Sequence, residues 1–250
     1  MTAIDISCDL GEATTADEHA TERELWPLVD SANVACGGHA GDATSMFEAA
    51  TLARRLGVRL GAHPSFPDRE GFGRTRIEIG DDDLVASLAS QIAALRAIAE
   101  AAGVQLERVK AHGALHNLAH RDLTLARLLV RATEESCRGS AIVCAASSAM
   151  ETAARERGFP VVREAFADRR YLPDGALVPR SDARALLEGP GDAAAQAVSI
   201  ATRNVAVAID GSEIAVAWDT ICIHSDMRDS VRRLVAIRAA LAAAGVGETI

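Results

Sequence analysis

One β-α-β unit is encoded by residues 30–63, which read DSANVACGGHAGDATSMFEAATLARRLGVRLGAH. A β-type run at Asp30–Cys36 ends in glycines, and apolar residues then recur at helical spacing over Ala43–Leu56. A second β-type run, Val58–His63, completes the unit. Two β-type runs joined by a helix of this length predict neighbouring parallel strands.

The same alternation continues along the rest of the chain. Further β-type runs lie at Ile4–Asp9, Arg108–His112, Ser140–Ala145, Pro160–Glu164 and Ala217–His224. Helical spacing recurs at Asp82–Ala102, Asp122–Glu135, Ser148–Arg157 and Met227–Ala244. Candidate helix caps are Asp42, Asp81 and Asp122 at the N-termini, and Gly57, Gly103 and Gly158 at the C-termini.

Sustained strand-helix alternation predicts an α/β fold with a parallel sheet covered by helices. About seven strands at this length favour a single-domain, distorted β/α barrel over the alternative, an open doubly wound sheet. Val205–Ile209 and Ser212–Ala217 flank Asp210-Gly211, which predicts a small β-hairpin appendage before the last barrel strand. No low-complexity linker divides residues 1–250, so one domain is expected.

The composition limits the classes of function. The 250 residues are 49% hydrophobic, and 26 basic against 35 acidic residues leave a formal charge of −9. Without a basic cluster, binding to nucleic acid or to an anionic membrane is not expected. No apolar run approaches the roughly 18 residues of a membrane helix, and the first residues do not resemble a secretory signal. The five cysteines include no C-x-x-C pair, which favours the reducing cytoplasm.

Polar side chains gather at the C-terminal ends of the predicted strands, where β/α folds build their active sites. They are Asp9, Glu12, Asn33, His39, His63, His112, Glu164, His224 and Asp226. These residues come from distant parts of the sequence. Their expected convergence at one mouth is the main argument from the residues for an enzyme.

Two loops strengthen individual candidates. Glycines flank His39 closely and predict a tight exposed turn there. Two prolines within four residues after His63 exclude a helix. The same rigid loop carries Arg74, whose planar guanidinium could clamp a carboxylate. Residues 114–117 are predicted as a turn.

Charged residues also follow two later strands. Lys110 and His112 share one face of a strand because side chains alternate with a period of two. A lysine that points into a barrel needs a charged partner or a catalytic role. Glu164, Asp168 and Arg169 lie in one short segment, where they could bind a substrate or form an internal ion pair.

Taken together, the motifs resemble one family, the A subunit of bacterial 5-oxoprolinase, also called the LamB/YcsF family. The matching pieces are CDLGE at 8–12, SANVACGGHAGD at 31–42, GAHPSFPD at 61–68, GFGR at 71–74, VKAHGALHN at 109–117, EAFADRRY at 164–171, LVPR at 177–180 and CIHSD at 222–226. They occur in the family's order and extend nearly from end to end. The chain departs from the usual family motifs at Ala111, His116 and Ser225, where proline, tyrosine and glycine are usual.

The resemblance implies a β/α barrel of the glycoside hydrolase/deacetylase type. It also implies ATP-dependent hydrolytic opening of 5-oxo-L-proline to L-glutamate, with subunits B and C of the same enzyme as partners. ATP and its Mg²⁺ are therefore the expected cofactors, and a homo-oligomer is a further possibility. The predicted catalytic residues are Asp9, His39, His63, Lys110 and His112. The predicted substrate-binding residues are Glu12, Asn33, Arg74, Glu164, Asp168, Arg169, His224 and Asp226.

For this reaction we hypothesise that Asp9 is the general base or a metal anchor. The three catalytic histidines would donate to, or ligate, whatever neutralises the developing oxyanion. Lys110 or Arg74 would hold a carboxylate or a phosphate, and His224 with Asp226 would form an oriented imidazole.

Two alternatives stay open. Asp9, His39 and His63 are ligand types for a divalent metal, which would favour an ATP-independent amidohydrolase or deacetylase acting on a small lactam or carbohydrate amide. The other alternative is a protein without catalytic activity that presents a small carboxylated ligand to its partners.

Overall fold

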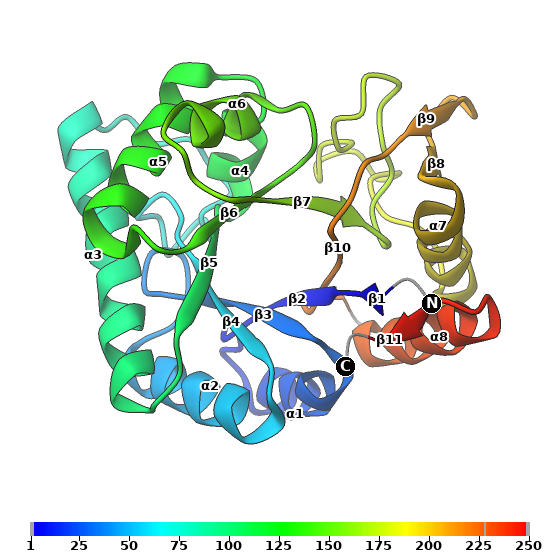
Figure 1. The fold of residues 1–250 in the computed structure, drawn as a ribbon, viewed down its shortest axis with the longest axis horizontal. Helices are drawn as coiled ribbons and strands as arrows, with labels where there is room; N and C mark the ends of the chain where they lie inside the picture. Colours follow the sequence, from blue (N-terminus) through cyan, green and yellow to red (C-terminus); the bar gives the residue numbers. More distant parts are fainter. Residues whose placement is uncertain (1–2, 228, 249–250) are drawn as a thin grey trace.

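The computed structural model describes residues 3–227 and 229–248, and its centre is a closed barrel of seven parallel strands (Figure 1). The order around the barrel is β10-β2-β3-β4-β5-β6-β7. These strands are β2 (Ile6–Leu10), β3 (Ser31–Ala35), β4 (Arg59–His63), β5 (Leu106–Lys110), β6 (Ala141–Cys144), β7 (Val161–Phe166) and β10 (Thr220–His224). The predicted seven-stranded barrel is thereby confirmed.

Helices surround the barrel and cover its outer face (Figure 1). They are α1 (Ala16–Leu25), α2 (Ala43–Leu56), α3 (Asp81–Ala101), α4 (Gly113–Ala119), α5 (Leu123–Cys137), α6 (Ala149–Glu156), α7 (Pro190–Arg203) and α8 (Ser230–Ala243), with a 3-10 turn at Trp26–Leu28. The predicted hairpin is confirmed as antiparallel β8 (Val205–Val207) and β9 (Glu213–Ala215). Short β1 (Ala3–Ile4) pairs in parallel with β11 (Gly247–Glu248) beside α8.

Three helices differ from the sequence prediction. The expected turn at residues 114–117 is part of α4, and neither α1 nor α7 was predicted. The first residues of α7 are Pro190 and Gly191, which usually indicate a loop, although proline is also favoured in the first turn of a helix. One predicted cap also differs: α3 is capped by Gly80, so Asp81 is its first residue.

The N-terminal end of the barrel is filled by a buried polar network. Arg108 donates to Asp5 at 2.8 Å and to Ser31 at 3.0 Å, and Arg59 donates to Asp5 at 2.9 Å. Gly61 makes room for this network, because a Cβ there would lie 2.6 Å from Cγ of Arg108. The network closes this end of the barrel, so the functional space lies at the other end.

Among the described residues, α3 is the one helix long and apolar enough to cross a membrane, a result that the sequence prediction did not anticipate. It packs against α2 and α5 outside the barrel. A helix in the core of a globular protein passes the same test of length and composition, so α3 is weak evidence for a membrane span.

Candidate functional site

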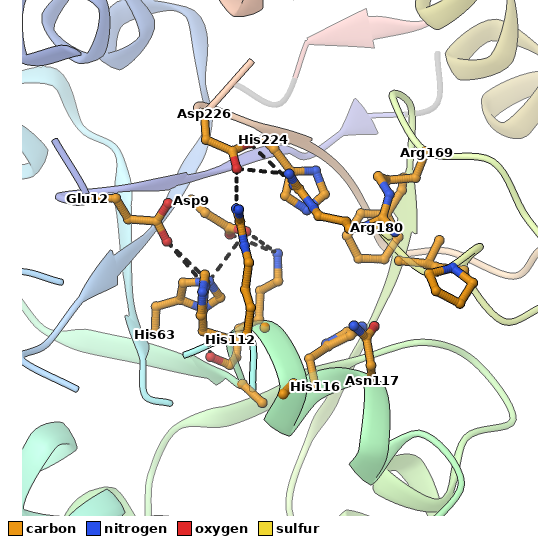
Figure 2. A pocket seen from close by; sticks show the side chains of 18 of the residues that line it. Asp9, Glu12, His63, His112, His116, Asn117, Arg169, Arg180, His224 and Asp226 are labelled. Atoms are coloured by element: carbon orange, nitrogen blue, oxygen red, sulfur yellow. Dashed lines mark hydrogen bonds and ion pairs between the residues drawn. The ribbon is translucent and has the colours of Figure 1, made fainter. Parts of the chain in front are cut away.

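A cavity of about 470 Å³ opens at the C-terminal ends of the barrel strands (Figure 2). The predicted site residues that line it are Asp9, Glu12, His63, Arg74, Lys110, His112, Arg169, His224 and Asp226. The other four are buried and contact lining residues from behind: Asn33, His39, Glu164 and Asp168. The structure thus brings all the predicted residues into one contiguous group.

A charged group forms the floor of the cavity. The Lys110 ammonium donates to both carboxylate oxygens of Asp9, at 2.8 and 3.0 Å, and lies 2.9 Å from Oε1 of Glu164. Asn33 donates to Asp9 at 2.9 Å, and Sγ of Cys222 lies 3.2 Å from the ammonium. Lys110 therefore satisfies the rule that a buried lysine is paired.

Two carboxylates against one ammonium leave an excess negative charge in a buried place. Burial opposes ionisation of Asp9, but His63 and Lys110 hold the pKa of that carboxyl well below its usual range. Burial raises the pKa of Glu164 to about 7, although Lys110 acts in the opposite direction. Asp9 is consequently ionised at neutral pH, while Glu164 exchanges its proton near neutrality.

Three histidines and Glu12 form a second cluster beside the floor. His39 Nε2 lies 2.9 Å from Glu12 Oε1, and His112 Nδ1 lies 3.2 Å from the same oxygen. The rings of His39 and His112 stack with centroids 3.6 Å apart, and His63 meets both rings edge-on. Gly73 allows this packing, because a Cβ there would lie 2.9 Å from Cβ of His39. Burial lowers the pKa of His39 to about 4, so this imidazole is neutral and donates to Glu12.

Two backbone carbonyls determine which ring nitrogens of this cluster carry hydrogen. His63 Nδ1 is 2.8 Å from the Lys110 carbonyl, and His112 Nε2 is 3.0 Å from the Phe72 carbonyl. A carbonyl oxygen only accepts, so both of these nitrogens donate. The remaining nitrogens, His63 Nε2 and His112 Nδ1, face each other at 3.0 Å and lie 3.8 and 3.2 Å from Glu12 Oε1. Three acceptors at these distances need a shared proton or a cation between them.

The acceptor group of Glu12, His63 and His112 has the composition of a metal site. Ligands about 2.0–2.1 Å from a tetrahedral Zn²⁺ are roughly 3.3 Å apart, close to the separations found here. Hydrogen bonds from ligand histidines to carbonyls are also typical of metal sites. This group differs from the predicted ligands Asp9, His39 and His63, because His39 donates to Glu12 from behind it. A divalent cation fits these side chains.

A third group pairs a histidine with a buried carboxylate. Asp168 accepts hydrogen bonds from the backbone nitrogen of His224 at 2.9 Å and from its Nδ1 at 3.0 Å. The sequence prediction of Asp226 as the partner of His224 is therefore wrong. The register of β7 against β10 places Phe166 opposite Cys222. Asp168 and His224, each two positions further along the chain, are therefore neighbours. The Phe166 ring stacks on His224 at 5.5 Å.

Two arginines, Arg169 and Arg180, lie on the side of the cavity away from Glu12 and His63 (Figure 2). Arg74 and Arg180 both pair with Asp226, Arg180 at 2.8 Å. Arg169 is 3% exposed and has no carboxylate partner among the described residues; its side chain donates to the Val178 carbonyl at 2.6 Å. Burial lowers the pKa of Arg169 to about 10, which leaves it charged at neutral pH.

Ten lining residues were not among the predicted site residues, and the polar ones are His116, Asn117, Arg180 and Ser181. Arg180 belongs to the LVPR motif, which was used only for the family resemblance. The presence of a basic residue in that motif could have identified Arg180 as a residue of the site. His116 and Asn117 face the cavity from α4. They were missed because the sequence predicts a turn where this short helix lies.

Comparison with known proteins identifies the family of the chain. It is 44% identical to the 5-oxoprolinase A subunit of Chloroflexus aggregans and 39% identical to that of Histophilus somni, each over 98% of both chains. The crystal structure of a lactam utilization protein from Thermus thermophilus matches with a TM-score of 0.90 and 39% identity over 99% of both chains. A protein of Enterococcus faecalis named for cellobiose-phosphate cleavage matches at 10% identity, with a TM-score of 0.57 over 99% of this chain and 97% of the other, and shares the fold alone. The LamB/YcsF family pattern matches residues 4–249, and the chain belongs to the LamB/YcsF family.

Proposed function

We propose that this chain hydrolyses 5-oxo-L-proline to L-glutamate as the A subunit of an ATP-dependent 5-oxoprolinase. The observation that carries the proposal is the polarity of the cavity, with a carboxylate-imidazole cluster on one side and Arg169 and Arg180 on the other. Such a pocket suits a small molecule that has a neutral amide at one end and a carboxylate at the other. The names of the relatives, which are 5-oxoprolinase A subunits and a lactam utilization protein, support the same choice.

Arg169 is our candidate for binding the substrate carboxylate. Its guanidinium is charged and buried, its Nε has no hydrogen-bond partner, and the cavity lies against it. A buried charge without a counter-ion is costly, so an anionic ligand is strongly favoured there. Arg180 and Arg74 add positive charge at the rim, partly neutralised by Asp226. A bidentate guanidinium contact would also orient the ring.

We assign the general base to His224 rather than to Asp9. Asp9 accepts a proton poorly because His63 and Lys110 hold its pKa well below the usual range. His224 Nδ1 donates to Asp168, so in the neutral ring Nε2 is an acceptor. In the proposed reaction Nε2 takes a proton from water as the oxygen attacks the lactam carbon. The carbon–nitrogen bond then breaks, and the proton passes to the leaving nitrogen.

The charged floor and the histidine cluster would stabilise the transition state. Lys110 is a permanent positive charge beside the cavity, because Asp9 raises its pKa despite burial. A divalent cation held by Glu12, His63 and His112 would act as a Lewis acid toward the amide oxygen. His39 would keep Glu12 ionised and in place. We retain Asp9, His39, His63, Lys110 and His112 as catalytic candidates on these grounds.

The nucleotide and the partners are proposed from the family. An amide is a poor electrophile, and transfer of the γ-phosphoryl group of ATP to the amide oxygen, with release of ADP, would activate it. Water would then open the ring to an acyl phosphate, and a second water would hydrolyse that to glutamate and inorganic phosphate. The names of the relatives, which designate one subunit among several, imply a multi-subunit complex. We propose that the partners are subunits B and C, that Mg²⁺ accompanies ATP, and that the location is cytoplasmic. Five free, buried cysteines are compatible with that location.

The test is product formation from 5-oxo-L-proline and ATP, by this chain alone and with subunits B and C. We expect glutamate and ADP in equal amounts in the complete mixture. The matched variant is Asp168→Asn, which should remove the activity without changing the size of the complex as judged by gel filtration. Folded protein that gives no glutamate in any mixture would refute the assignment.

The geometry of Glu12, His63 and His112 favours one second candidate, a metal-dependent amidohydrolase or deacetylase that needs no ATP. It predicts lactam or carbohydrate amide hydrolysis by the chain alone. This activity would be lost on chelation and restored by Zn²⁺ or another divalent ion. The 5-oxoprolinase instead predicts a nucleotide requirement, so omitting ATP separates the two candidates.

A further inference from the structure

A second cavity of about 290 Å³ adjoins the first and is assigned no role in the proposed reaction. Five residues line both cavities and form the neck between them: His116, Asn117, Phe166, Leu177 and Pro179. We call the second cavity the side chamber.

The neck lies next to the groups proposed to react. The ring of Phe166 has the Lys110 ammonium 5.3 Å from its centroid and the His224 ring stacked at 5.5 Å. His116 meets the same ring edge-on at 5.8 Å. A substituent on a ligand held beside Lys110 and His224 would therefore reach the side chamber past one aromatic ring.

The outer wall of the chamber is a turn that the chain holds in place by itself. Tyr171 and Leu177 form an antiparallel bridge, and Leu172 donates to the carbonyl of Ala176 at 2.7 Å. The Tyr171 hydroxyl accepts a hydrogen bond from the backbone nitrogen of Phe166 at 2.7 Å, which fixes its ring. A wall made this way is formed before any ligand binds, which lowers the entropy cost of binding.

Most residues that line the chamber are apolar. Besides His116 and Asn117 at the neck, the polar lining residues are His120, Arg121, which pairs with Asp174, and Glu164. Leu118, Leu172 and Ala176 contribute to its walls together with the rings of Phe166 and Tyr171. Burial lowers the pKa of His116 well below its usual range, so its ring presents no charge to the chamber. Apolar cavities with a few polar groups are typical of ligand sites, and sites of roughly 300–1,000 Å³ hold drug-sized molecules. The unsubstituted five-membered lactam fills only part of the main cavity.

We propose that the side chamber is a subsite for an apolar substituent on the lactam ring. The substrate class is then carboxylated lactams with an apolar ring substituent, and 5-oxo-L-proline is its smallest member. The carboxylate would stay on Arg169 and the amide near Lys110 and His224. This inference rests on the proposed function, because it places a lactam in the main cavity.

The experiment compares 5-oxo-L-proline with 4-benzyl-5-oxo-L-proline on the whole chain. Dissociation constants come from calorimetry, and kcat/KM comes from glutamate or 4-benzylglutamate formation in the mixture with subunits B and C. The test variant is Ala176→Phe, which fills the chamber. The control is Ala183→Phe, because Ala183 is exposed in the same loop and lines neither cavity.

We expect the benzyl lactam to bind at least about tenfold more tightly than 5-oxo-L-proline. Ala176→Phe should remove that preference, and Ala183→Phe should keep it, with both variants melting as the unchanged chain does. If Ala176→Phe does not fold, Ala145→Leu fills the same chamber from the end of β6 and gives the same comparison. Equal binding of the two lactams, or a preference that survives filling of the chamber, overturns the subsite.

Turnover separates this inference from the function it rests on. If 5-oxo-L-proline is hydrolysed but the benzyl preference is absent, the subsite fails and the proposed function stands. If the preference is present and sensitive to Ala176→Phe but no lactam is hydrolysed, the subsite stands and the proposed function fails. Absence of binding by both lactams overturns both.

Discussion

The stability of the Glu164→Gln variant, relative to that of the unchanged chain, should increase as pH rises. The Glu164 side chain is fully buried, and burial raises its pKa from 4.5 to about 7. A raised carboxyl pKa means that the folded state holds the proton more tightly than the unfolded state. The unchanged chain therefore loses stability as pH rises from the unfolded value, near 4.5, through the folded value, near 7.

The size of the effect follows from the two pKa values. A difference of about 2.5 pKa units corresponds to roughly 3 kcal/mol. Glutamine has nearly the same shape and no proton to lose, so the variant escapes this loss. The free energy of unfolding of Glu164→Gln, relative to the unchanged chain, should rise by about 3 kcal/mol between about pH 4.5 and pH 8.

Urea denaturation at a series of pH values measures this difference. Glu107→Gln is the control for removing one negative charge, because Glu107 is exposed on the outer face of β5. The result that refutes the reasoning is a difference between Glu164→Gln and the unchanged chain that stays constant across this pH range. A difference that moves in the opposite direction would refute it equally.

Three further predictions concern the site. Asp168→Asn should lower kcat by at least about 100-fold with little change in KM, because His224 loses the carboxylate that fixes its tautomer; steady-state kinetics decide, and an equal loss in KM would contradict this role. Arg169→Met should raise KM at least about tenfold while a surface control, Arg55→Met, leaves it unchanged, since Arg169 lines the cavity and Arg55 does not; calorimetry of 5-oxo-L-proline checks this independently of turnover. His63→Ala combined with His112→Ala should abolish binding of one Zn²⁺ per chain, as measured by equilibrium dialysis and elemental analysis; stoichiometric zinc on the double variant would exclude this metal site.

The ends of a helix could be predicted from the sequence where the capping residues lie next to the helix itself. The predicted limits of α2 are those observed, because the Asp42 side chain accepts hydrogen bonds from Thr44 and Ser45 and Gly57 adopts a left-handed conformation with φ +72°. α4 was missed because seven residues are too few to show helical periodicity. His116 was therefore named only as a departure from the family motif and not as a residue of the site.

The sequence predicted which residues form the site, but it could not predict which of them contact one another. Polar residues at strand ends must converge in a barrel, which is why nine predicted residues line one cavity. The partner of His224 depends on the register between β7 and β10, and no local pattern encodes that register. The group of Glu12, His63 and His112 likewise depends on distances across three strands and on carbonyls that fix two tautomers.

The network of Asp5, Arg59 and Arg108 bears on how substrate and product reach and leave the cavity. Asp5 and Arg108 are buried at the N-terminal end of the barrel, and the cavity lies at the opposite end, where the strands finish. If substrate and product share the opening at that end, a bound product blocks the next substrate until it leaves. A partner subunit bound over that opening would control both the entry of substrate and the release of product.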